Sequence, residues 1–170
     1  MFTFTGFEFH RRCFGQALAV LLLCLLGAQA PAQTLPTPQV IGSSWVYSTP
    51  GIYHNVRADL VQAIEDEGLV ISYTAHLASM LRRTANATGA TTQVYDNAES
   101  LLFCSSELTY ELTLHNPHNI TLCPYSISIY SLKADPENVL LSIRAPELEQ
   151  ADYAAVHQLL EQIIAATLTW

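Results

Sequence analysis

Two stretches of the chain repeat apolar residues at the three- and four-residue spacing of an amphipathic helix. The first covers residues 53–64 and is followed by Gly68, the glycine expected just beyond a helix C-terminus. The second covers residues 153–168, after Pro146, and includes Leu159, Leu160 and Ile163. The pattern therefore predicts one helix in the first half of the chain and one at its C-terminus.

Two shorter helices are predicted between them. One runs from about residue 76 to residue 86 and places Met80 on its apolar side, as a core residue. The other begins at a serine cap, Ser105 or Ser106, and stops before Pro117, because the residue before a proline disfavours helical geometry.

Strands are predicted where apolar and polar residues alternate, or where β-branched and aromatic residues cluster. Residues 134–138, which contain Asp135-Pro136, predict a hairpin turn before the last strand, which carries Val139, Leu141 and Ile143. The other predicted strands are 44–49, 69–75, 91–95, 101–105 and 120–132. This order of elements predicts an α+β fold: a single domain with an antiparallel sheet, helices packed on one face, and an amphipathic C-terminal helix.

The N-terminal region has the pattern of a secretory signal peptide. Arg11 and Arg12 precede an apolar run over residues 17–26, and small residues follow up to Ala32. The run is about half the roughly 20 residues needed to span a membrane. Cleavage fits after Ala30 or after Ala32, and we expect the second, because the first would leave Pro31 immediately after the cut. We then expect export to the periplasm or the extracellular space, and no membrane association afterwards.

The predicted organisation of the chain has four parts. They are a signal peptide (1–32), an extended N-terminal arm (33–43), an α+β domain (44–146) and a C-terminal helix (147–170). The 138 residues left after cleavage are enough for one domain with a hydrophobic core.

The charge of the chain argues against a nucleic-acid partner. The full chain has 7 Lys and Arg against 15 Asp and Glu, for a net charge of −8. Cleavage would remove Arg11, Arg12 and Glu8, which lowers the net charge to −9. Arg82-Arg83 is then the only adjacent basic pair, too little for a phosphate-binding surface. The same balance argues against an anionic membrane surface.

Cys104 and Cys123 are the two cysteines that remain after cleavage. An even number of cysteines in an oxidising compartment predicts a disulfide, which is the first interpretation of the pair. A redox-active pair is an alternative, since Cys104 just precedes a predicted helix. A soft-metal site for copper is another, formed by Cys104, Cys123, His76 and Met80, the last two of which are one helical turn apart.

Five segments in a fixed order resemble a known family. They are EDEGLVIS, HLASMLRRT, FCSSELT, NITLCPYSISIY and VLLSIRAP, which lie between residues 65 and 146, and the resemblance as a whole covers residues 47–146. Their order and spacing resemble the family called domain of unknown function 302, and within it the exported, cysteine-containing branch. The resemblance implies a compact α+β domain that is a dimer in some relatives and has no established activity.

The sequence shows no catalytic, haem, metalloprotease or phosphate-loop motif. Our first hypothesis is therefore an exported, non-enzymatic domain that binds a small ligand or a protein partner. We expect a homodimer, in which the apolar helix over residues 153–168 packs across subunits. The alternative is a thiol-redox or copper-binding protein that uses the cysteine pair.

Overall fold

The computed structural model describes residues 36–146 and 153–169 of the chain. The predicted signal peptide, the start of the predicted arm and the first residues of the predicted C-terminal segment lie outside these ranges. No described helix combines the length and apolar character needed to cross a membrane.

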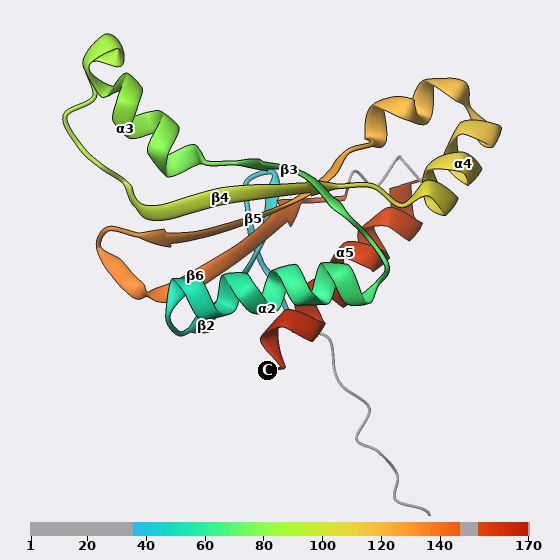
Figure 1. Ribbon diagram of the computed structural model, residues 1–170, viewed down its shortest axis with the longest axis horizontal. Helices are drawn as coiled ribbons and strands as arrows, with labels where there is room; N and C mark the ends of the chain where they lie inside the picture. The colour runs from blue at the N-terminus through green and yellow to red at the C-terminus, as the bar shows by residue number, and fades with distance from the viewer. Residues whose placement is uncertain (1–35, 147–152, 170) are drawn as a thin grey trace, which may run out of the picture. The chain divides into compact units, whose positions relative to one another are not determined.

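An antiparallel sheet forms the centre of the fold (Figure 1). Its six strands lie in the order β1-β2-β6-β5-β4-β3 and include an edge strand, β1, within the predicted arm. The strands are β1 (Gln39–Ile41), β2 (Ser44–Pro50), β3 (Ile71–Ala75), β4 (Tyr95–Phe103), β5 (Tyr125–Leu132) and β6 (Asp135–Arg144). The helices are α2 (Tyr53–Asp66), α3 (Leu77–Thr88), α4 (Ser106–His115), the 3-10 helix η1 (Pro117–Leu122) and α5 (Ala154–Leu168). The predicted α+β class and antiparallel sheet are confirmed.

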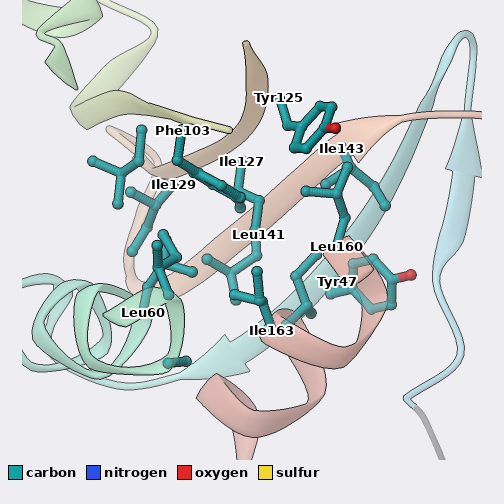
Figure 2. Close-up of a cluster of buried hydrophobic side chains, with 14 of the residues drawn as sticks. Tyr47, Leu60, Phe103, Tyr125, Ile127, Ile129, Leu141, Ile143, Leu160 and Ile163 are labelled. Atoms are coloured by element: carbon teal, nitrogen blue, oxygen red, sulfur yellow. The ribbon is translucent and has the colours of Figure 1, made fainter. Parts of the chain in front are cut away.

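Helices α2 and α5 cover one face of the sheet and form the core with it. Figure 2 shows Leu60 of α2 and Leu160 of α5 beside the fully buried Ile127 and Leu141 of the sheet. Alternation along the strands produces this face, since every second residue is buried along β5 and, in β6, from Val139 to Ile143. The C-terminal helix thus packs on its own chain, and its apolar side is not free to cover a partner subunit as we had expected.

The opposite face of the sheet is more polar. Ser100, Ser128 and Ser142 stand side by side on β4, β5 and β6. The Ser128 hydroxyl donates a hydrogen bond of 3.2 Å to that of Ser100. This row explains why the helices that bury the core gather on the other face.

Helix α3 makes few of the contacts that its amphipathic pattern predicted. Ala78 is its only buried residue, and Gly89, at a φ of 68°, ends it as a left-handed cap. Met80 is 42% exposed, so its assignment to the core was wrong. Figure 1 shows α3 projecting beyond the sheet, attached through β3 and β4.

The boundaries of three strands differ from those predicted. The two short strands predicted around Asp96-Asn97 are one strand, β4, whose polar residues contact other polar groups instead of ending the strand. The predicted strand over residues 120–132 begins only at Tyr125, because η1 occupies its first part. The hairpin turn is Lys133-Ala134, and Asp135 already pairs with Leu132 in the sheet.

Candidate functional site

A hollow of about 490 Å³ opens where α2, α3 and β4 meet. We call it the α2–α3 hollow. The first turns of both helices line it, together with the first half of β4. Its lining residues are Tyr53, His54, Arg57, His76, Ala78, Ser79, Arg82, Arg83, Asp96, Asn97, Ala98 and Glu99. Most of these side chains are polar, which distinguishes the hollow from the apolar core beneath it.

Glu99 is the centre of the polar lining. Its carboxylate accepts a hydrogen bond from the Arg57 guanidinium on one oxygen and lies 2.9 Å from His76 Nδ1 on the other. Burial raises the pKa of Glu99, but the hydrogen bonds and charges of Arg57 and His76 outweigh it and hold the pKa below its usual value. Glu99 is therefore ionised at neutral pH and ties β4 to the starts of both helices.

Tyr53 contributes a buried hydroxyl at the same place. The residue is 6% exposed, and its Oη has no hydrogen-bond partner among the described residues. Burial raises the pKa of Tyr53, and the nearby charge of Glu99 raises it further, whereas Arg57 acts in the opposite direction. A neutral phenol with an unused donor thus lines the hollow.

The second carboxylate of the hollow is also neutralised. Asp96 Oδ1 lies 2.6 Å from Lys133 Nζ, and Asp96 Oδ2 accepts a hydrogen bond from the Asn97 side-chain amide. Arg82 and Arg83 are different, because neither forms an ion pair within residues 36–146 and 153–169. The hollow therefore holds two guanidinium groups without a counter-charge.

The N-termini of two helices add to this positive character. Neither α2 nor α3 has an acidic residue in its first turn, and neither has a side-chain hydrogen bond at its cap. Their first-turn residues, Tyr53 and His54 in α2 and Ala78 and Ser79 in α3, line the hollow. Uncapped backbone N–H groups and the helix dipole both favour negative charge at such positions.

Cys104 and Cys123 form a disulfide, with their Cα atoms 5.9 Å apart. The bond joins the residue after β4 to the residue after η1, and both cysteines are only partly buried. Since Glu99 precedes Cys104 by five residues on an extended strand, the disulfide lies roughly 15 Å from the hollow along β4. The cysteine pair and the hollow are separate features of the fold.

The four residues of the predicted copper site do not come together. Ala75, just before His76, pairs with Ser100, so His76 lies about 13 Å along the strand from Cys104. His76 contacts Glu99, and both thiols are used in the disulfide. Among residues 36–146 and 153–169, no three His, Cys, Asp or Glu side chains are grouped as metal ligands.

Sequence reasoning found His76 in this region but missed the rest of the hollow. Arg57 and Glu99 are 42 positions apart, so no local motif connects them. Arg82-Arg83 was a visible signal, because it is the only adjacent basic pair outside the predicted signal peptide. The importance of this pair became clear only from the structure, in which the other charged residues of the hollow, Arg57, Glu99 and Asp96, are already paired.

The fold and the hollow define a small α+β domain whose sheet is covered by helices on one face. No protein-family model matches the chain, and no curated protein matches it. Among solved structures, it is similar to an uncharacterized conserved protein, DUF302, from Bacillus stearothermophilus. The alignment has a TM-score of 0.56 and 12% sequence identity, and covers 76% of this chain and 98% of the other. The chain thus has the fold of a domain of unknown function 302 protein, as the sequence resemblance implied.

Proposed function

We propose that this protein is an exported, non-enzymatic domain that binds a small ligand in the α2–α3 hollow. One observation carries the proposal: polar groups from α2, α3 and β4 converge on a hollow lined by Tyr53, whose buried hydroxyl has no hydrogen-bond partner among the described residues. A buried donor without a partner costs free energy, and a bound ligand that accepts its hydrogen bond would recover it.

The volume of the hollow and the fixed positions of its lining side chains favour a small-molecule ligand over a protein partner. Its volume of 490 Å³ falls within the range of about 300–1,000 Å³ found for small-molecule sites. The hydrogen bond that Glu99 accepts from Arg57, together with its contact with His76, holds these lining side chains in place before any ligand arrives. Pre-organised groups of this kind reduce the entropy lost on binding.

A ligand screen with a blocked variant tests the proposal. The purified protein is screened by thermal denaturation against small metabolites that include sugars, amino acids, organic acids and phosphate esters. Ser79→Trp fills the hollow from α3, whereas Asn86→Trp places the same side chain on an exposed position of the same helix. We expect at least one compound to raise the melting temperature of wild type and Asn86→Trp but not of Ser79→Trp. If no compound shows this pattern, the hollow is not a binding site.

We also propose export and a homodimer. Export is supported by the signal-peptide pattern together with the disulfide, and N-terminal sequencing of protein from the periplasm or medium should start at Gln33. The dimer is supported by the family resemblance and by the exposed apolar residues of α3, Met80 and Leu81. Light scattering should give twice the monomer mass; a monomer at high micromolar concentration would exclude the dimer.

A further inference from the structure

We infer that the α2–α3 hollow selects an oxyanion, that is, a small organic molecule bearing phosphate or carboxylate groups. This inference rests on the proposed function and names the chemical class of its ligand. It comes from the distribution of charge in and around the hollow.

Positive charge is concentrated in the hollow even though the chain as a whole is acidic. The full sequence carries a net charge of −8. Five Lys and Arg residues lie within the described ranges, and three of them, Arg57, Arg82 and Arg83, line this one hollow. A positive recess on an acidic surface focuses the electrostatic field on small anions that can enter it.

The carboxylates of the hollow are already satisfied by protein groups. Glu99 is bound by Arg57 and His76, and Asp96 is bound by Lys133. A cationic ligand would have to displace these partners. An anion instead meets the guanidinium groups of Arg82 and Arg83, which form no ion pair with any residue that the structure describes and can each donate a pair of parallel hydrogen bonds to a carboxylate or phosphate.

Backbone and phenol donors add to the match with an anion. The first-turn residues of α2 and α3 that line the hollow belong to helix N-termini without side-chain caps, and Tyr53, another lining residue, has a buried hydroxyl that is an unused donor among the described residues. Arginine side chains, helix N-termini and a phenol are all hydrogen-bond donors, so these groups of the hollow require the same kind of partner. They need acceptor oxygens.

The shape of the site limits the anion to a small molecule. A hollow of 490 Å³ admits an organic anion of metabolite size, and the surrounding net negative charge repels a nucleic acid or an anionic membrane.

Isothermal titration of the purified protein with citrate and with inorganic phosphate tests the inference. Spermidine and glucose serve as the cationic and neutral counter-probes. We expect at least one of the two anions to bind more tightly than both counter-probes, with an affinity that falls as sodium chloride is raised. Tighter binding by spermidine or glucose overturns the inference.

Two sets of variants locate the binding. Arg82→Gln and Arg83→Gln should each weaken anion binding about ten-fold, the loss expected for one charged hydrogen-bonding group of roughly 1.4 kcal/mol. Arg144→Gln is the matched control, because Arg144 is an exposed arginine at the end of β6, near the opposite end of the sheet. Equal effects of all three substitutions would show a non-specific charge effect and overturn the inference.

Glu99→Gln provides a test of opposite sign. The substitution removes the negative charge that neutralises Arg57, so anion binding should strengthen several-fold. A merely structural role for Glu99 predicts weaker binding. Circular dichroism confirms that the variant is folded, and unchanged or weaker binding by a folded variant counts against the inference.

The failure of this inference differs from the failure of the proposed function. A neutral or cationic compound whose binding is blocked by Ser79→Trp leaves the hollow as a ligand site and overturns the oxyanion class. The absence of any compound blocked by Ser79→Trp overturns both. Anion binding lost in Ser79→Trp, Arg82→Gln and Arg83→Gln supports both.

Discussion

Removal of the disulfide offers the most direct test of how the fold is stabilised. Cys104 and Cys123 are 19 positions apart, and the bond between them closes a loop that contains α4 and η1. Replacing both with Ser leaves no single thiol that could form a wrong disulfide. A second double variant with Ala at both positions separates the loss of the bond from the cost of a new, partly buried hydroxyl.

The expected loss of stability follows from the length of the loop. A cross-link over about 20 residues lowers the entropy of the unfolded chain by an amount worth about 3 kcal/mol at 25 °C. For a domain of this size, the same loss corresponds to a fall of roughly 10 °C in melting temperature. Since the effect acts on the unfolded chain, that chain should also become less compact, and the dependence of unfolding free energy on urea should steepen.

Urea denaturation followed by circular dichroism measures both quantities. Wild-type protein treated with dithiothreitol should match the double variants, because it lacks the same cross-link. Binding to the α2–α3 hollow should be unchanged in the folded variants, since the disulfide joins the opposite end of β4 to the residue after η1. A loss below about 1 kcal/mol would refute the loop-entropy argument, and a loss of ligand binding in a folded variant would contradict the separation of the disulfide from the hollow.

Three further substitutions probe the core, a helix cap and the charged cluster. Leu160→Ala should lower the unfolding free energy by about 3 kcal/mol, because the Leu160 side chain is only 1% exposed in the core. Urea denaturation measures this loss, and a loss under about 1 kcal/mol would contradict the packing of α5 on its own chain. Ser105→Ala should cost about 1 kcal/mol in the same assay, because the Ser105 hydroxyl caps α4 by accepting a hydrogen bond from the Leu108 N–H; Ser106→Ala is the control. Glu99→Gln should destabilise the protein at pH 7 and much less at pH 3. The pKa of Glu99 is lower in the folded protein than in the unfolded chain, where a glutamate has a pKa of about 4.3. The ionised carboxylate therefore stabilises the fold fully above the unfolded-state pKa, and this contribution is lost as the pH falls through the folded-state pKa. An equal difference at both pH values would contradict this sign.

The core of the fold could be predicted because it depends on periodicity. The helical spacing of residues 53–64 and 153–168 and the alternation in β5 and β6 identified the residues that the structure buries, such as Leu60, Ile127 and Leu160. Burial of apolar area is the largest favourable contribution to folding, so a pattern that creates one continuous apolar face leaves few alternatives.

Predictions failed where residues met partners distant in the sequence. The polar residues Asp96 and Asn97 suggested a break between two strands, but Asp96 is held by Lys133 and the strand continues. Met80 has the spacing of a core residue, yet α3 extends beyond the sheet and leaves it exposed. Periodicity shows which side of a helix is apolar, but not whether anything covers that side.

The sequence by itself determined the fold class, the apolar face of each main element and the cysteine pair at the centre of residues 101–130. Each of these depends on local spacing or on composition. Only the tertiary structure showed that Arg57, His76 and Glu99 meet, and that Arg82 and Arg83 beside them have no ion-pair partner in the part of the chain that the structure describes. The physical reason is that the charge of a site is a sum over neighbours in space. Three elements separated along the chain supply that sum here, and the sheet brings them together only after its strands have paired.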